Sequence, residues 1–400
     1  MTRHDEGDGV APAPLTRVPS MVVVSDRIDW QGGEGERPDW ADLPPDQRPW
    51  TAPDAAPPEV VGSYLERLPL ACIAAGIVQQ AEIWHHQHGG ARVAYQSAGP
   101  RLGYRGFLLD DPAAPFDNRD MLAFVRAYGA PHILVVYGLG VSCDLLDACA
   151  RSVVVYNSID APTLRVPPEV SARFDLVLTG AEWQSREVEA RHPGTATAIM
   201  PVGPEFAGVD QFRPLGTDKD YDLIYVAAAQ GYKRHDILLG ALEQLPRDVR
   251  GLLVFGYGED ADAIRRRVAA AGLAVDCIGP PGVAIDEVNR LMNRARFGVV
   301  CGRDDGAPAI LTEYMLAGLP VLCNVELACG RQFILPDTGR LAAPEEFADA
   351  ILAMRRDAAA FAPRQAVLER WTWPHTIERL RPLLARVAVQ KRSSILTSVD

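Results

Sequence analysis

The chain lacks an excess of positive charge, a long hydrophobic run and closely spaced cysteines. Its 400 residues carry 40 Lys and Arg against 52 Asp and Glu, which gives a formal net charge of −12. This balance argues against a nucleic-acid partner and against docking on anionic lipid through a generally basic surface. The longest apolar run, residues 70–78, is too short to cross a bilayer, so no integral membrane association is expected.

Two further absences bear on the compartment. Seven cysteines are scattered without any Cys-x-x-Cys pair, and most of them lie in apolar runs. This usage favours buried, reduced thiols in a cytoplasmic protein. Residues 1–19 are polar, acidic and proline-bearing, which predicts a flexible tail rather than an export signal.

What the sequence does contain is ordinary globular composition, 48% hydrophobic and 23% charged, over a length sufficient for two cored domains. Apolar, β-branched runs such as residues 21–25, 133–137 and 152–156 predict buried strands, with helical spacing between many of them. A second series of alternating strands and helices begins near residue 223. We therefore predict the α/β class, with two Rossmann-like domains in tandem.

The segment that follows the first strand is predicted to contain little sheet. The expected elements are a loop over 26–58, a helix over 64–87, a strand over 92–96 and a loop over 101–117. His85, His86 and His88 would then end the predicted helix. Because no fourth ligand is evident, we interpret them as surface or helix-end residues rather than as a metal site.

Residues 303–322 carry the clearest functional pattern. They predict a strand end, a tight Gly-Ala-Pro turn, one short helix and a Gly-Leu-Pro stop. Asp305 lies in the turn and Glu313 lies inside the helix. Free amides at a helix start, beside a glycine, favour an anion, and two flanking carboxylates suit sugar hydroxyls. The stretch therefore predicts a site for a nucleoside-diphosphate sugar.

Several short motifs accompany this stretch in a fixed order. They are Pro201-Val202-Gly203, Phe212-Arg213-Pro214, Lys233-Arg234-His235-Asp236, Phe255-Gly256-Tyr257-Gly258, Asp305 to Glu313 with Ala317-Gly318-Leu319-Pro320-Val321, and Thr338-Gly339-Arg340-Leu341. Together they resemble the retaining glycosyltransferases of the GT-B fold, family 4. The resemblance covers residues 198–390 well and the N-terminal half only in outline.

The resemblance implies two Rossmann-like domains that face each other across a cleft, with the C-terminal helix crossing back to the N-terminal domain. The expected division is a flexible tail over 1–19, an N-terminal acceptor domain over 20–210, a C-terminal donor domain over 211–375, and a C-terminal helix and tail over 376–400. It also implies a nucleotide sugar held mainly by the C-terminal domain, and neither a metal ion nor any other cofactor.

Roles for three charged residues also follow from the resemblance. Lys233 would neutralise the leaving diphosphate, Glu313 would hold the ribose hydroxyls, and Asp305 would contact the donor sugar, where the family usually has glutamate. The alternatives are a solvated helix-start lysine, a salt-bridged helix glutamate and a helix-capping aspartate. The full set of expected donor-binding residues is Gly231, Lys233, Arg234, Gly256, Tyr257, Pro280, Arg303, Asp305, Gly306, Ala307, Pro308, Ala309, Ile310, Leu311 and Glu313.

The N-terminal half offers weaker candidates. Gly32 and Gly33 are placed where the family has a phosphate-facing glycine pair, and Asn157 ends a strand on the expected side of the cleft. Asp160 either orients and deprotonates an acceptor, as a catalytic residue, or simply forms a turn. Three tryptophans of the long loop either stack on an acceptor or pin the loop to its domain: Trp30, Trp40 and Trp50.

The sequence departs from the family pattern at two places. Alanines occupy positions 227–229, where the family usually carries an arginine, and no histidine lies near Asp160. The leading interpretation is a retaining hexosyltransferase that moves a sugar from a nucleoside diphosphate, with UDP as the working case, to a small soluble acceptor. The alternatives are other GT-B chemistry, such as an epimerase or phosphorylase, and a non-catalytic nucleotide-sugar-binding partner protein. A homodimer is left open.

Overall fold

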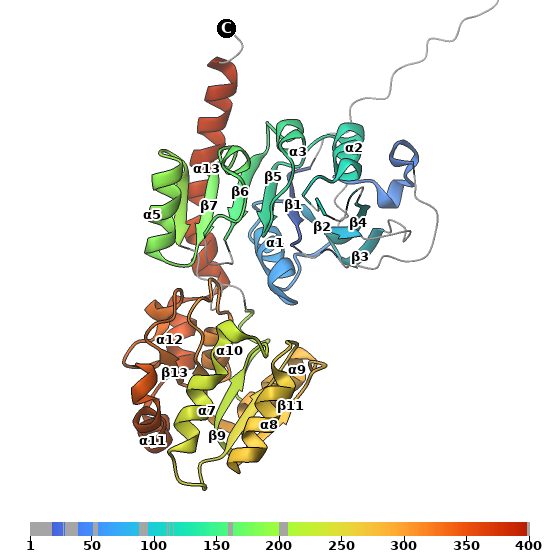
Figure 1. The fold of residues 1–400 in the computed structure, drawn as a ribbon. Helices are drawn as coiled ribbons and strands as arrows, with labels where there is room; N and C mark the ends of the chain where they lie inside the picture. The colour runs from blue at the N-terminus through green and yellow to red at the C-terminus, as the bar shows by residue number, and fades with distance from the viewer. Residues whose placement is uncertain are drawn as a thin grey trace, which may run out of the picture.

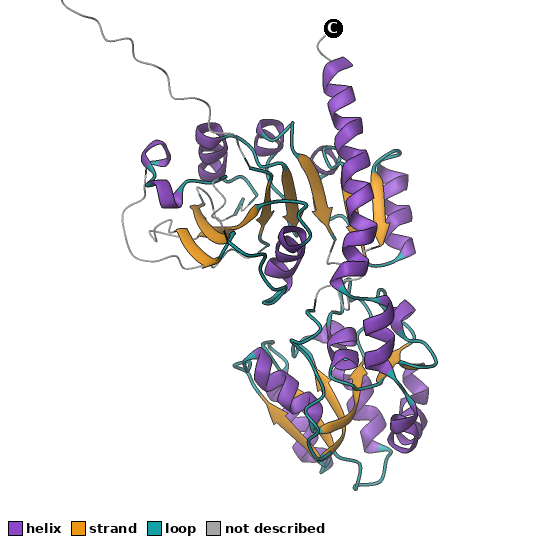
Figure 2. Cartoon of the chain, turned by 180° about the vertical axis from the view of Figure 1, so that it is seen from behind, coloured by secondary structure: helices purple, strands orange, loops and turns teal. Residues whose placement is uncertain are grey.

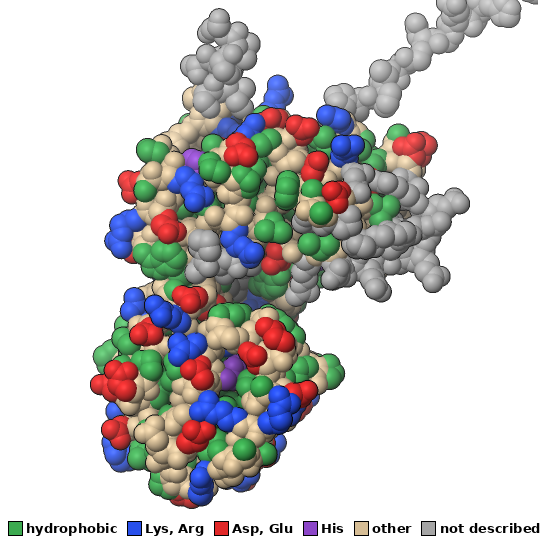
Figure 3. Space-filling model, viewed as in Figure 1, with side chains coloured by type: hydrophobic (Ala, Val, Ile, Leu, Met, Phe, Trp, Pro, Cys, Tyr) green, Lys and Arg blue, Asp and Glu red, His purple; other side chains and the backbone are tan. Residues whose placement is uncertain are grey.

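The computed structural model describes residues 18–26, 28, 39–50, 55–87, 95–109, 111, 113–114, 116–158, 163–199 and 207–397. Within these ranges the chain forms two α/β domains, one above the other in Figure 1, each with helices on both faces of a sheet (Figures 1 and 2). On the face shown in Figure 3, acidic and basic side chains are interspersed over both domains.

The N-terminal sheet has the strand order β3-β4-β2-β1-β5-β6-β7-β8, and its pairs are parallel except for β3 with β4. Its strands are β1 (Ser20–Val24), β2 (Gln80–Gln87), β3 (Tyr95–Gly99), β4 (Leu102–Leu108), β5 (Ile133–Tyr137), β6 (Val153–Asn157), β7 (Leu176–Thr179) and β8 (Ala196–Ile199). Its helices are α1 (Tyr64–Ala74), α2 (Arg119–Tyr128), α3 (Cys143–Ala148), α4 (Pro168–Ser171) and α5 (Glu182–Arg191).

The C-terminal sheet is parallel throughout, in the order β11-β10-β9-β12-β13-β14. Its strands are β9 (Tyr221–Val226), β10 (Gly251–Val254), β11 (Val275–Ile278), β12 (Ala295–Val300), β13 (Val321–Asn324) and β14 (Gly339–Ala342). Its helices are α7 (His235–Glu243), α8 (Ala261–Ala271), α9 (Ile285–Asn293), α10 (Ile310–Leu316), α11 (Phe347–Asp357) and α12 (Pro363–Arg370). The order reverses between β9 and β12, and such a reversal opens a ligand crevice at the carboxyl ends of the strands.

The last helix, α13 (Trp373–Thr397), returns to the N-terminal domain, as expected (Figure 1). Its buried apolar stripe joins the core formed by α1, β1 and β5: Trp373, Ile377, Leu380, Leu384 and Val387. The chain therefore passes between the domains twice. Residues 208–211 and 372–374, which belong to the two passages, line one cavity of about 690 Å³. None of the helices in the described part of the chain combines the length and apolar character needed to span a bilayer.

The predictions for residues 64–117 were wrong in two places. The helix ends at Ala74, and β2 occupies the second half of the range that was predicted to be helical. The range 101–117, predicted as a loop, contains β4. Both strands were missed because charged and polar residues are buried in them, such as Glu82 and Arg105, so neither strand shows the apolar run or the alternation that marks a strand in sequence.

The histidines of this region are not surface residues. His85 and His86 lie on β2 and are each 4% exposed, whereas His88 lies outside the described residues. Burial, followed by the charge of His85, lowers the pKa of His86 to about 4. Its Nδ1 lies 3.2 Å from the Asn118 amide nitrogen. Among the described residues, no group of His, Cys, Asp and Glu side chains is arranged to hold a metal ion.

Two of the loop tryptophans are part of the N-terminal core. Trp40 and Trp50 are 7% and 5% exposed. Their indole nitrogens donate to the Asp120 carboxylate at 2.8 Å and to the Tyr128 carbonyl at 3.2 Å. These two residues therefore pin the loop to the domain and do not face an acceptor, while Trp30 lies outside the described residues.

A buried ion pair joins β2 to β4. Arg105 donates to both Glu82 carboxylate oxygens, at 2.8 and 2.9 Å, and the side chains are 1% and 3% exposed. The Trp84 indole also donates to Glu82 at 2.9 Å, and the Phe124 ring lies 4.5 Å from the guanidinium. With its hydrogen-bonding groups occupied, the pair is tolerated at a depth where one partner alone would be strongly unfavourable.

Removing one member of this pair is therefore expected to cost more than removing both. Glu82→Gln should lower the free energy of unfolding by about 3–5 kcal/mol, because it leaves the Arg105 guanidinium buried without a counter-charge. The double variant Glu82→Gln/Arg105→Met should lose less than the sum of the single variants. Urea unfolding of the four proteins measures this coupling, and strictly additive losses would contradict it.

Candidate functional site

Lys233 lies at the carboxyl edge of the C-terminal sheet, in the loop between β9 and α7. The loop forms a single 3₁₀ turn, Gly231–Lys233, and Arg234 then takes a left-handed conformation with φ of 52° before the helix begins. The Lys233 ammonium forms an ion pair with the Asp305 carboxylate. Burial lowers the pKa of Lys233, but the charge and hydrogen bond of Asp305, together with the nearby Tyr232 and Tyr257 hydroxyls, outweigh this, so the net pKa is raised and the side chain stays charged.

Asp305 reaches this contact from the loop between β12 and α10. The residue is 7% exposed, and its second oxygen accepts from the Ala307 amide at 3.3 Å. Helix α10 has Ala309 as its N-cap and no side-chain cap, so the helix-capping alternative for Asp305 does not hold. The loops after β9 and β12 flank the reversal in strand order, which explains how residues 72 positions apart come together.

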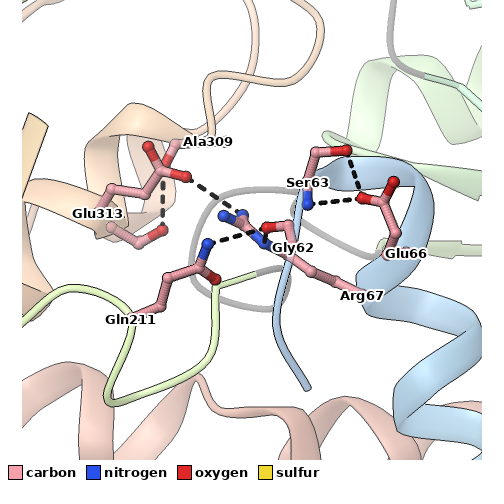
Figure 4. Close-up of polar contacts among 8 residues, drawn as sticks. Gly62, Ser63, Glu66, Arg67, Gln211, Ala309 and Glu313 are labelled. Carbon is pink, nitrogen blue, oxygen red and sulfur yellow. Dashed lines mark hydrogen bonds and ion pairs between the residues drawn. The ribbon is translucent and has the colours of Figure 1, made fainter. Parts of the chain in front are cut away.

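Glu313 lies in the first turn of α10 and is paired across the domain boundary (Figure 4). Its Oε1 lies 3.2 Å from Nη1 of Arg67, which belongs to α1, and the two side chains are 15% and 4% exposed. Glu313 is thus salt-bridged, and its partner comes from the opposite domain. Arg67 was not among the predicted site residues, although a lone arginine in the apolar run of α1 was a signal for it.

The start of α1 sets the position of Arg67. Ser63 and Glu66 form a capping box, in which Glu66 accepts from the Ser63 amide at 2.6 Å. Gly62, with φ of 91°, turns its carbonyl toward Arg67 Nε at 2.8 Å. The same carbonyl accepts from Gln211, in the segment that enters the C-terminal domain, at 2.9 Å. Figure 4 shows these contacts converging on the seam between α1 and α10.

The domains also meet beside the start of α10. A Cβ on Gly180 would lie 2.8 Å from the Gly306 carbonyl oxygen, so the two backbones touch there. Trp183 donates to the Ala328 carbonyl at 2.9 Å, and Gln332 donates to the Gly180 carbonyl at 3.0 Å. Asp305, Glu313 and the turn between them therefore face the N-terminal domain at close range.

The other predicted donor-binding residues fall into three groups. Gly256, Tyr257 and Pro280 are exposed and follow the carboxyl ends of β10 and β11, next to the Lys233 loop in sheet order. Arg234 forms a bidentate pair with Asp236, with both distances 2.9 Å, and the Arg303 side chain is exposed. Residues that line the turn or the first part of α10 are Gly306, Ala307, Pro308, Ala309, Ile310 and Leu311.

On the N-terminal side, Asn157 ends β6 and is 1% exposed. Its side-chain amide nitrogen has no hydrogen-bond partner among the described residues. Tyr64, at the start of α1, donates to the Asp26 carboxylate at 2.6 Å, and neither residue was among the predicted site residues. The predicted residues Gly32, Gly33 and Asp160 lie outside the described residues.

His235 is buried directly behind Lys233 and is 5% exposed. Its ring lies 4.8 Å from the Tyr225 ring and 5.5 Å from the Phe255 ring, centroid to centroid. Burial, and then the Lys233 charge, lower the pKa of His235 to about 4. The folded protein therefore keeps this imidazole neutral over a range in which the unfolded chain is protonated.

The lower pKa of His235 in the folded protein predicts that the free energy of unfolding depends on pH. Below about pH 6.5 the unfolded state binds a proton at His235 and the folded state does not, so the free energy of unfolding falls as the pH falls. Between pH 7 and pH 5 the contribution is about 2 kcal/mol. His235→Phe should lose correspondingly less stability than the parent over that range in urea titrations. Equal losses would show that His235 does not titrate in this way.

Comparisons with known proteins agree with this arrangement. Residues 210–362 match the family model "Glycosyl transferases group 1". A sucrose-phosphate synthase from Thermosynechococcus elongatus superposes with a TM-score of 0.63 at 15% identity, covering 95% of this chain and 100% of the other. HepE of Anabaena, solved with UDP and glucose, superposes with a TM-score of 0.62 at 15% identity, covering 92% and 100%.

A lipopolysaccharide outer core galactosyltransferase, WaaB, gives a TM-score of 0.58 at 12% identity, covering 92% of this chain and 99% of the other. A search of curated proteins finds no match. At these identities the structural likeness establishes the fold. Residues 210–362 thus form a glycosyl transferases group 1 domain, and the chain as a whole has the GT-B fold of two facing Rossmann-like domains.

Proposed function

We propose that this protein is a retaining glycosyltransferase that moves a sugar from a nucleoside diphosphate to a small soluble acceptor. The observation that carries the proposal is the convergence of Lys233, Asp305 and Glu313 at the carboxyl edge of the C-terminal sheet, facing the other domain. A cation beside two carboxylates matches a ligand that has a diphosphate at its centre and hydroxyl groups at both ends.

In this proposal each residue acts on one part of the donor. Glu313 accepts hydrogen bonds from the ribose hydroxyls, and Asp305 accepts them from the sugar. Lys233 stabilises the charge that develops on the diphosphate as the bond from the anomeric carbon to the phosphate oxygen breaks. The acceptor oxygen bonds to that carbon on the same face, and its proton passes to the departing phosphate oxygen. This scheme uses no protein nucleophile and no metal ion.

The choice of donor starts from the structural neighbours. HepE was solved with UDP and glucose, and a pneumococcal O-GlcNAc transferase with a TM-score of 0.52 and 13% identity was solved with UDP and GlcNAc. UDP-sugars are therefore the first donors to test. The acceptor would enter from the N-terminal side, where the Asn157 amide nitrogen, which has no partner among the described residues, lies at the end of β6.

A second candidate is a non-catalytic protein that binds nucleotide sugars. One observation favours it, since residues 227–229 are alanines in the loop that leads to Lys233. Lys233 is then the residue of this loop that pairs with Asp305. A catalytic role would require Lys233 to neutralise most of the charge that develops on the leaving diphosphate. Turnover separates the two candidates, because both bind the nucleotide and only one transfers sugar.

Nucleotide binding should be visible as stabilisation. A ligand at one hundred times its Kd adds about 2.7 kcal/mol to the free energy of unfolding. We expect UDP to raise the melting temperature in a panel of nucleoside diphosphates with ADP and GDP, and we expect the same shift in the presence of EDTA. If none of these diphosphates or their sugars stabilises the protein, the proposed donor site is wrong. If EDTA abolishes the shift, the metal-free scheme is wrong.

Lys233→Met should separate transfer from binding. We expect kcat for sugar transfer to fall about 10²- to 10³-fold, because the developing charge on the leaving diphosphate loses its cation. Lys391→Met is the matched control, since Lys391 pairs with Asp175 at the distant end of α13. A Lys233→Met enzyme with parental kcat would refute the assigned role. Absence of transfer by the parent protein over a panel of acceptors would favour the non-catalytic candidate.

A further inference from the structure

Both carboxylates of the candidate donor site are already neutralised by cations of the protein. Asp305 is paired with Lys233 from the same domain, and Glu313 is paired with Arg67 from the other. If the ribose takes Glu313, as proposed above, its hydroxyls compete with the guanidinium for Oε1, the oxygen that Arg67 Nη1 contacts at 3.2 Å. A donor that takes this oxygen does more than fill a pocket, because it separates an ion pair.

Arg67 cannot simply be released into water when this happens. Its side chain is 4% exposed, and Nε is held by the Gly62 carbonyl at 2.8 Å. The Gly62 carbonyl is itself fixed by Gln211, and the capping box at Ser63 fixes the turn that follows. A buried guanidinium that loses its carboxylate without gaining another anion is strongly unfavourable. The ligand that displaces Arg67 from Glu313 must therefore supply the new anion.

We propose that Arg67 exchanges Glu313 for the diphosphate of the donor, so that the N-terminal domain contributes a phosphate-binding cation. This inference rests on the proposed function. The planar guanidinium suits the exchange, because its parallel N–H groups match phosphate oxygens as well as carboxylate oxygens. With Nε anchored on Gly62, the Nη atoms are the ones that change partner.

The start of α10 lies along the same seam as Arg67. Glu313 lies one helical turn after Ala309, whose carbonyl accepts the Glu313 amide at 3.3 Å. One turn of helix is roughly 5 Å long, so the start of α10 is about that far from Glu313 along the axis. Ala307 and Ala309 also pack against the N-terminal core that contains α1, which places the turn between Asp305 and Glu313 on the side of Arg67.

The exchange also accounts for the alanines at 227–229. A donor diphosphate carries at least two negative charges, and on the C-terminal side of the seam Lys233 is the cation that is paired with a site carboxylate. Arg67 would bring a second cation from the opposite domain. The site would then select for the diphosphate itself, because a nucleoside alone displaces Arg67 without compensating its charge.

The competing explanation is that Arg67 only clamps the domains together, or only blocks the site. The experiment is to measure the Kd of UDP, UMP and uridine by calorimetry for the parent, Arg67→Gln and Arg67→Lys. Exchange predicts that Arg67→Gln weakens UDP binding at least tenfold and leaves uridine binding unchanged or tighter. Arg67→Lys should retain part of the UDP affinity, since it keeps the positive charge but lacks the parallel N–H groups of the guanidinium.

Arg173→Gln is the matched control, because Arg173 forms an exposed pair with Asp147 elsewhere in the same domain. Its UDP affinity should equal that of the parent. UDP binding by Arg67→Gln that is equal to or tighter than that of the parent overturns the exchange, and equal weakening of UDP and uridine also overturns it, in favour of a clamp. Should Arg67→Gln fail to fold, Arg67→Lys decides by the same comparison.

The two proposals fail in distinguishable ways. If the parent binds none of the three ligands and none of the other nucleoside diphosphates in the panel, the donor site itself is wrong. If the parent binds UDP and Arg67→Gln binds it with the parental affinity or more tightly, the donor site stands and only the exchange is wrong.

Discussion

The ion pair between Arg67 and Glu313 joins α1 of one domain to α10 of the other at the candidate site. It is supported from the N-terminal side by the Gly62 carbonyl and from the interdomain segment by Gln211, so α1, α10 and the linker meet at one seam. The physical requirement behind it also governs Glu82 with Arg105 and Lys233 with Asp305, since a buried charge is tolerated only with its partner in place. The two pairs at the seam lie where the proposed donor would bind, whereas the pair between β2 and β4 is buried in the core.

The C-terminal domain was largely predictable from sequence because its determinants are local. Its buried parallel strands are short apolar runs, as in β10, and the motifs at their ends follow within a few residues. The approach of Lys233 to Asp305 could be expected, because both follow strands that are neighbours in such a fold. Strands β2 and β4 and the contact of Arg67 with Glu313 could not, because each depends on a partner distant in sequence: 23 residues for Glu82 and Arg105, and 246 for Arg67 and Glu313.

The departures from the family pattern are linked in the structure. A shorter acid at position 305 lies against Lys233, and the alanines at 227–229 leave Lys233 as the cation of this loop that pairs with Asp305, since Arg234 pairs with Asp236. Arg67 lies on the facing surface, so positive charge is divided between the two halves of the seam instead of being concentrated on one. A ligand with a charged diphosphate at its centre would then bridge the two domains. The nucleoside and sugar at its two ends would contribute mainly to specificity.

The course of the chain at the seam limits how the halves can move. The backbone passes between the domains once before β9 and again before α13, and residues 208–211 and 372–374 of these passages line the same cavity. Two adjacent backbone connections permit the domains to rotate about the line that joins them, and they resist rotation about other axes. A single proteolytic cut in either passage would also leave the halves attached, because α13 remains packed in the N-terminal core.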